Sequence, residues 1–329
     1  MQLLYLRGTL MKFTILSITA TLLLSACAPQ ATQPTPANSP EEATPTTISV
    51  SHMSGVTEVP INPQNVMVFD MGMLDTMDAL GLSYRVVGLP MSSLPERLAH
   101  FGEGGFHDLG TLHEPNFEEI IRHDVDLIII SGRARPHFDD LSQIAPTIDL
   151  GLNINDMLNS FLQNNNYIAQ IFGVEEEMEL ILADIFEQIS EVGLLASQLE
   201  NNRTLTLLYN EGQLSAFGSL GRFGIINDSF GFASSDPQIE IINHGMLVSN
   251  EYVVSQDPAI LFIIDRNYAV GLGEISYDDI ENELIQLTTA YQLGNIFYLT
   301  GEVWYISPGG IQGMQIQIDD MRNAVLSAS

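Results

Sequence analysis

Short apolar runs alternate with segments of helical period from about residue 48 to the end of the chain. In the first half, four apolar runs predict buried strands: VMVFD (66–70), RVVGLP (85–90), DLIIIS (126–131) and TIDLGL (147–152). Among them lie segments with a helical period, such as PNFEEIIRHD (115–124) and NDMLNSFLQNNNYIAQIFG (155–173). After residue 200 the alternation resumes with RTLTLLYN, AILFIIDR and IFYLTGEVWYIS, and a final helix is predicted near residues 311–327. Because the pattern occurs twice, we expect an α/β fold with two Rossmann-like lobes.

The segment between the two halves, EEEMELILADIFEQISEVGLLASQLEN (175–201), predicts a single helix of about 25 residues. Its first turn is acidic, which favours a helix N-terminus. Apolar residues recur along it at helical spacing: Met178, Ile181, Leu182, Ile185, Ile189 and Val192. We therefore expect residues 174–201 to form a stiff helix that connects an N-terminal lobe (49–173) to a C-terminal lobe (202–329).

The start of the chain predicts export and lipid anchoring. MKFTILSITATLLLSA (11–26) has an early lysine and an apolar run that is too short for a comfortable membrane span. LSAC (24–27) resembles a bacterial lipobox, so residues 1–27 are predicted to be a lipoprotein signal peptide that ends at Cys27. The alternative is an ordinary signal peptide with an incidental cysteine. Residues 28–48 are rich in Pro, Ala and Thr and predict a disordered tether. The expected location is extracytoplasmic, on the periplasmic side in a Gram-negative envelope.

Charge changes how the arginines are interpreted. Beyond Cys27 the chain has nine arginines, no lysine and all 41 acidic residues, a net charge of −32. Such a field repels nucleic acid and anionic lipid, which excludes nucleic-acid binding. The field is also typical of a solvated surface in salty or alkaline surroundings. In a chain with so few cations, each arginine becomes a candidate for binding an anion.

Three arginines stand out by position. DVDLIIISGR (124–133) and DPAILFIIDR (257–266) each run from an aspartate through an apolar strand to an arginine. Arg133 and Arg266 thus follow the carboxyl ends of predicted strands, where open α/β sheets bind ligands. Arg222 lies in the glycine-rich stretch LSAFGSLGRFGII (214–226). Three guanidinium groups in one cleft would suit an aromatic polyanion, whereas each alone suits an ion pair with a carboxylate.

Other candidate chemistry is weaker. Of the seven histidines, five (His100, His107, His113, His123 and His137) lie between residues 100 and 137, at spacings that match no compact metal-ligand pattern, so most are expected on the surface. The sequence has no G-x-S-x-G, no GxxxxGK[ST] and no H-E-x-x-H motif. This absence favours a binding protein over an enzyme.

Several stretches together carry a family resemblance. EVPINPQNVMVFDMGMLDTMDALGL, DLIIISGR, IAPTIDLGL, SAFGSLGRFGIIND and LFIIDRN, with the later VWY, resemble the ferric-siderophore-binding lipoproteins that feed ABC importers. The likeness runs from about residue 55 to the end. It is strongest to the branch that takes catecholate ligands such as petrobactin and hydrolysed enterobactin. The resemblance implies two α/β lobes bridged by one long helix, with the ligand between the lobes.

The resemblance also implies roles for individual residues. The three arginines that line the family's cleft fall on Arg133, Arg222 and Arg266, and the residues that can bind iron directly fall on His244 and Tyr305. The expected protein is a monomer without an intrinsic cofactor. It would take ferric iron as a siderophore complex and deliver it to an ABC permease and its ATPase. The alternatives are the same fold binding haem, cobalamin, a citrate or hydroxamate siderophore or a divalent metal, and, less favoured, a surface enzyme.

Overall fold

The computed structural model describes residues 46–242, 244–273 and 276–328. Residues 45–329 cluster as one compact unit. The predicted signal peptide, its Cys27 and most of the predicted tether lie outside the described residues.

The chain enters the fold at β1 (Thr47–His52), which pairs antiparallel with β2 (Gly55–Pro60). Thr47 and Ile48, which we predicted to belong to the tether, therefore belong to a strand. No helix of the described part combines the length and the apolar character needed to cross a membrane.

The N-terminal half is built on a parallel sheet, as the apolar runs predicted. Its strand order is β5-β4-β3-β6-β7. The bounds are β3 (Val66–Phe69), β4 (Val86–Leu89), β5 (His107–Asp108), β6 (Leu127–Ile130) and β7 (Thr147–Asp149). Every residue of β3 and β6 is buried, which is typical of parallel strands covered on both faces. The helices of this half are α1 (Met71–Ala79), α2 (Phe117–Ile121), α3 (Phe138–Leu141) and α4 (Met157–Phe172).

The C-terminal half has a mixed sheet of order β11-β9-β8-β12-β13, with β10 added beside β8. The bounds are β8 (Arg203–Asn210), β9 (Gln213–Phe217), β10 (Ala233–Ser234), β11 (Met246–Val248), β12 (Ile260–Asp265) and β13 (Ile296–Leu299). Strands β8 and β9 form an antiparallel hairpin, which the predicted alternation did not anticipate. Its loop residues Glu211 and Gly212 both have positive φ, 48° and 85°, as a tight two-residue hairpin turn requires. The short helices here are α6 (Ile225–Asp228), α7 (Asn250–Gln256), α8 (Arg266–Ala269), α9 (Tyr277–Ile280) and α10 (Thr289–Leu293).

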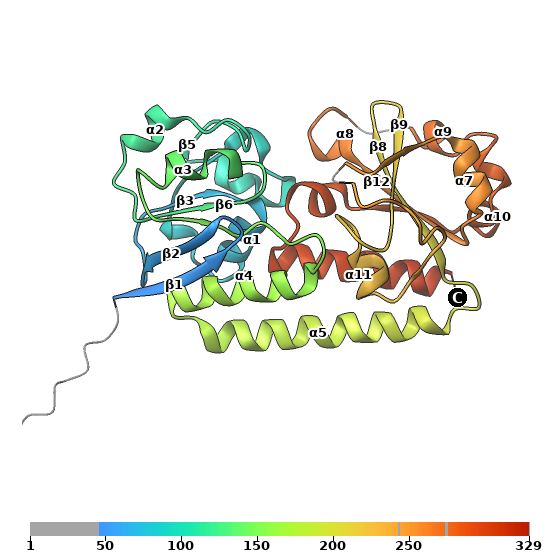
Figure 1. Cartoon of the computed structure of the whole chain (residues 1–329), viewed down its shortest axis with the longest axis horizontal. Helices are drawn as coiled ribbons and strands as arrows, with labels where there is room; N and C mark the ends of the chain where they lie inside the picture. The colour runs from blue at the N-terminus through green and yellow to red at the C-terminus, as the bar shows by residue number, and fades with distance from the viewer. Residues whose placement is uncertain (1–45, 243, 274–275, 329) are drawn as a thin grey trace, which may run out of the picture. The chain divides into compact units, whose positions relative to one another are not determined.

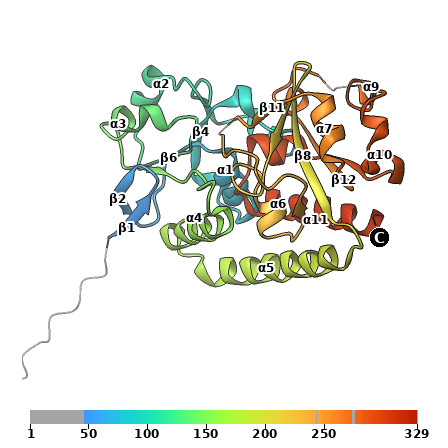
Figure 2. The same cartoon turned by 45° about the vertical axis from the view of Figure 1, so that its right-hand side comes forward.

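One long helix, α5 (Glu175–Gln198), connects the two halves and packs beside α4 and α11 (Ile311–Ser327) (Figures 1 and 2). Five of the six apolar residues predicted to form its inner face are buried, and Ile181 is half-buried. The α/β fold with a long connecting helix is thus confirmed. The C-terminal helix α11 adds a second link, because it also packs against α1 of the first half. A β-carbon on Gly310, just before α11, would lie 2.6 Å from the carbonyl oxygen of Gly72 in α1.

Candidate functional site

The candidate site is organised around Tyr305, which lies in a π-helical turn, Glu302–Ile306, that follows β13. The sequence EVWYI was predicted to continue a strand, and this prediction was wrong. Trp304 fixes the turn to α11, because its buried indole Nε1 donates to Asp320 Oδ2 at 2.8 Å. Tyr305, the next residue, is half-buried. Single π-helical turns occur frequently at functional sites.

The three predicted arginines reach Tyr305 from separate segments of the chain. Arg133 follows β6, Arg266 follows β12, and Arg222 lies in the loop between β9 and α6. The guanidinium carbons of Arg133, Arg222 and Arg266 lie 5.5, 4.2 and 5.5 Å from the centre of the Tyr305 ring. The structure therefore brings together all three side chains, which are separated by up to 133 positions in sequence.

Each arginine also has a specific hydrogen bond to Tyr305. Arg133 Nη2 and Arg222 Nη2 both donate to the backbone oxygen of Tyr305, at 2.8 and 2.7 Å. Arg266 Nε donates to the phenolic oxygen at 2.9 Å, and its Nη1 donates to Asn210 at 2.8 Å. All these acceptors are uncharged in the ordinary protonation state. The hydrogen bonds thus orient the guanidinium groups without neutralising them.

Within the described part of the chain, no carboxylate lies within 4.0 Å of any of these three guanidinium groups. Burial lowers the pKa of Arg222 to about 10, and the neighbouring charges of Arg133 and Arg266 act in the same direction. Burial likewise lowers the pKa of Arg133. The buried Nε of Arg222 has no hydrogen-bond partner among the described residues. Such a group of converging cations is costly to bury unless an anion compensates it.

The same cations change the acidity of Tyr305. Burial alone would raise the pKa of its phenol, but the hydrogen bond from Arg266 and the charges of Arg222, Arg266 and Arg133 outweigh burial. The net result is a pKa below the ordinary value of a tyrosine. A phenol of this kind is prepared to act as a phenolate, the form that binds a hard metal ion.

A cavity of about 430 Å³ opens beside this group and is lined by residues of both halves. Arg133, Arg222 and Tyr305 form part of its wall, and so does His244, which is exposed. Of the five histidines between residues 100 and 137, His113 also lines the cavity. Burial lowers the pKa of its imidazole, and the charge of Arg133 acts in the same direction. Spacing along the sequence gave no reason to separate His113 from the other surface histidines.

Two further wall residues were missed by the sequence analysis. Asp70 follows β3 and caps α1, accepting from the backbone N–H groups of Gly72 and Met73 at 2.8 and 3.2 Å. Like Arg133, Asp70 is a polar residue just beyond the carboxyl end of a buried strand, so its position in the sequence is a signal for the site. Arg135 lines the cavity as well, but its guanidinium forms an ion pair with the buried Asp149. Arg135 therefore differs from Arg133, Arg222 and Arg266, for which the described residues supply no carboxylate within 4.0 Å.

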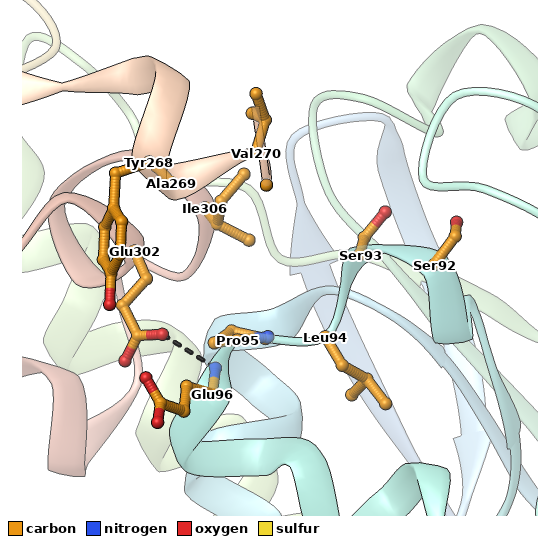
Figure 3. Close-up of a pocket in the computed structure, with 11 residues that line it drawn as sticks. Ser92, Ser93, Leu94, Pro95, Glu96, Tyr268, Ala269, Val270, Glu302 and Ile306 are labelled. Carbon is orange, nitrogen blue, oxygen red and sulfur yellow. Dashed lines mark hydrogen bonds between the residues drawn. The ribbon is translucent and has the colours of Figure 1, made fainter. Parts of the chain in front are cut away.

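A smaller cavity of about 320 Å³ lies next to the first and shares Ile306 with it (Figure 3). It separates residues 92–96 of the first half from Tyr268 and Ala269 of α8 and from Val270, which follows this helix. Across it, Glu302 of the π-helical turn accepts the backbone N–H of Glu96 at 2.8 Å. The turn that carries Tyr305 is thus fixed to the opposite half by a direct hydrogen bond.

The chain is similar in sequence and in structure to known binding proteins. The model of a family described as periplasmic binding protein matches residues 66–303. The chain is 36% identical over 318 residues to the petrobactin-binding protein YclQ of Bacillus subtilis, an alignment that covers 95% of this chain and 99% of YclQ. The crystal structure of YclQ superposes with a TM-score of 0.82 at 38% identity, over 85% of this chain and 98% of that structure.

Two other solved structures extend the comparison. The periplasmic catecholate-siderophore binding protein VctP of Vibrio cholerae has a TM-score of 0.80 at 30% identity, covering 84% of this chain and 99% of VctP. The siderophore-binding protein BauB, solved with two molecules of acinetobactin and ferric iron, has a TM-score of 0.77 at 28% identity. That alignment covers 85% of this chain and 98% of BauB.

Proposed function

The chain belongs to the periplasmic binding protein family, and from this premise we propose that it captures a ferric catecholate siderophore for an ABC importer. The single observation that carries the proposal is the convergence of Arg133, Arg222 and Arg266 on Tyr305 without a carboxylate partner among the described residues. The names of YclQ and VctP, which state petrobactin and catecholate siderophores, support this ligand class.

Charge matches the three arginines to this ligand. Each catecholate group contributes two negative charges, so a ferric bis-catecholate centre carries −1 and a tris-catecholate centre −3. Guanidinium groups near the catecholate oxygens offset this charge and donate charge-assisted hydrogen bonds. The aromatic rings of the ligand also offer surfaces on which guanidinium groups stack.

The positive charge of the three arginines is opposite in sign to the net charge of the whole protein. The acidic surface repels a distant anion, but salt screens that field beyond about 8 to 10 Å. The arginine group therefore determines the potential inside the cavity. Binding there relieves the repulsion among the three cations, which helps to explain why a chain with nine arginines beyond Cys27 places three of them together.

We propose direct iron ligands for the case of a tetradentate siderophore. Ferric iron is usually six-coordinate, so a bis-catecholate leaves two positions open. Tyr305 would supply a phenolate, favoured by its lowered pKa, and His244 an imidazole nitrogen. A hexadentate ligand would leave both side chains free of iron, and the arginines alone would then carry recognition.

The proposal extends to the roles that the family resemblance implies. The protein would be tethered to the membrane through a lipid on Cys27, would act outside the cytoplasm as a monomer, and would deliver its ligand to a permease coupled to an ATPase. No intrinsic cofactor and no catalytic residue is part of this proposal. Iron is the cargo and arrives already chelated.

The proposal is tested by titrating the protein with ferric mono-, bis- and tris-catecholates, ferric citrate, a ferric hydroxamate, haem, cobalamin and zinc. Fluorescence of Trp304, the only tryptophan and the direct neighbour of Tyr305, reports on occupancy. We expect a ferric catecholate to bind at least about a hundredfold more tightly than the other compounds, a difference of about 2.7 kcal/mol. Preference for haem, cobalamin, citrate or hydroxamate would keep the fold and overturn the ligand class.

A further inference from the structure

A second group of potential metal ligands lies in the N-terminal half, and none of its members lines the cavity around Tyr305. His107 begins β5, Glu119 lies in α2, and His123 follows α2 by two residues. One ligand atom from each of the three lies within 4.8 Å of the other two. The fold thus brings together two histidines that are 16 positions apart, which the spacing argument had treated as unrelated surface residues.

The geometry within the group is specific. Glu119 Oε1 lies 3.1 Å from Nε2 of His123 and 3.5 Å from Nδ1 of His107. The two imidazole rings are stacked, with centres 3.6 Å apart and planes inclined by 29°. One carboxylate oxygen therefore faces a nitrogen of each ring. A metal ion beside this oxygen would therefore have one ring nitrogen of each histidine within reach.

A neighbouring residue holds the carboxylate in place. Arg122 Nη1 donates to Glu119 Oε2 at 2.8 Å, and Arg122 also pairs with Glu118. The second oxygen of Glu119 is thereby occupied, which leaves Oε1 to face the histidines. Hydrogen bonds of this kind orient the ligands of natural metal sites. The guanidinium also reduces the local negative charge, so we expect moderate rather than extreme affinity.

We propose that His107, Glu119 and His123 bind a divalent transition-metal ion of the zinc class, independently of the proposed siderophore site. Two imidazoles and one carboxylate form a ligand set used by zinc, with further positions left to water. Magnesium and calcium prefer oxygen ligands throughout and should bind poorly. The side chains of all three residues are partly exposed, by 43, 23 and 25% in chain order, so an ion has access from solvent.

Binding would add a link between β5 and the segment that contains α2. Strand β5 is an edge strand of only two residues, paired with β4 through Gly88 and Leu89. A metal bound by His107, Glu119 and His123 would fix this edge to α2 and the loop that follows it. Because only the folded protein holds the three ligands together, the metal should raise thermal stability in a concentration-dependent way.

The experiment is calorimetric titration of the chelator-treated protein with zinc chloride, with magnesium chloride as the comparison. We expect one zinc ion per chain with a dissociation constant in the micromolar range, no binding of magnesium, and a melting temperature that rises with zinc concentration. His107→Ala and His123→Ala should each weaken zinc binding at least about tenfold. The matched control His100→Ala removes a histidine that pairs with Asp78 outside the group, and should bind zinc as the wild type does.

Two further variants separate this site from the cavity. A His113→Ala/His244→Ala variant removes both cavity histidines and should keep the zinc affinity. Zinc binding that survives in a His107→Ala/His123→Ala variant, or that is absent from the wild type, would overturn the proposal. Ferric catecholate affinity in these variants is measured separately, so failure of one proposal leaves the other intact.

Discussion

Arg266 Nε donates a hydrogen bond of 2.9 Å to the phenolic oxygen of Tyr305, the atom that our proposal assigns to iron. The hydrogen bond stabilises the phenolate relative to the phenol, and the charges of the three arginines act in the same direction. The two residues come from different elements, since Arg266 begins α8 directly after β12 and Tyr305 lies in the π-helical turn after β13. The arginine that is proposed to bind the ligand thus also prepares the proposed iron ligand.

The first prediction concerns Tyr305→Phe, which removes the phenolic oxygen and keeps the ring. We expect the visible charge-transfer band of a bound ferric bis-catecholate to differ from the wild-type band, because the iron loses its phenolate ligand. A ferric tris-catecholate, which needs no ligand from the protein, should have the same spectrum in both proteins. Absorption spectra at saturating protein provide the measurement. Tyr167→Phe, in α4 and outside the cavity lining, is the control, and an unchanged bis-catecholate band in Tyr305→Phe would contradict direct ligation.

The second prediction concerns Arg222→Ala. Because this guanidinium lies nearest the Tyr305 ring, at 4.2 Å, its loss should weaken ferric catecholate binding by about 1.5 to 3 kcal/mol. That loss corresponds to roughly a 10- to 150-fold higher dissociation constant, measured by quenching of Trp304. Arg322→Ala removes a cation of α11 that pairs with Asp319 at 3.0 Å, and should leave the affinity unchanged. Equal affinities of the two variants would remove Arg222 from the site.

Much of the fold could be predicted because buried parallel strands leave a continuous apolar signature. The runs that predicted β3, β4, β6 and β7 overlap these strands, and the acidic start and apolar spacing of α5 located the connecting helix. The π-helical turn at Glu302–Ile306 was missed because its continuous run of apolar and aromatic residues is also typical of a buried strand. Its conformation depends on Asp320 of α11, a contact that no local pattern contains.

The sequence indicated several residues of the candidate site, but it did not indicate the contacts among them, because those contacts depend on the tertiary fold. Position after a strand selected Arg133 and Arg266, and the family resemblance supplied Tyr305 and His244. The sequence could not tell whether these arginines form ion pairs with carboxylates or converge on Tyr305, because that depends on the tertiary fold. His107 and His123 show this limit most clearly, since their rings stack although nothing in their spacing indicates it.

The third prediction concerns the close approach of α1 to the start of α11. A β-carbon at Gly310 would lie 1.9 Å from Asp75 Oδ2 and 2.6 Å from the backbone oxygen of Gly72. Gly310→Ala should therefore force the two segments apart and lower the free energy of unfolding by about 2 kcal/mol or more. Urea unfolding followed by circular dichroism measures the loss. Gly102→Ala is the matched control, because its added methyl would meet only Leu94, at 3.6 Å. Equal midpoints for the two variants would show that α11 is not tightly fixed to α1.

The fourth prediction concerns the pH dependence of stability through Asp70, whose side chain is almost fully buried beside the cavity. Burial raises the pKa of this carboxyl to about 7 from 3.8, against the opposing effects of its backbone hydrogen bonds and Arg133. Between these values the folded protein retains a proton that the unfolded chain has released. The contribution of Asp70 to the free energy of unfolding is therefore present below about pH 4 and decreases as the pH rises to about 7, by at most on the order of 4 kcal/mol.

Asp70→Asn tests this directly, because asparagine keeps an oxygen to cap α1 and does not titrate. We expect the variant to gain stability relative to the wild type as the pH rises from about 4 to 7, since only the wild type must then either retain a proton or bury a charge. Comparing the two proteins at each pH cancels the contributions of other carboxyls such as Asp75 and Asp320, whose pKa values are also raised by burial. Asp139→Asn, on the exposed side of α3, should follow the wild-type curve. A constant difference between Asp70→Asn and the wild type across this range would show that Asp70 does not titrate there.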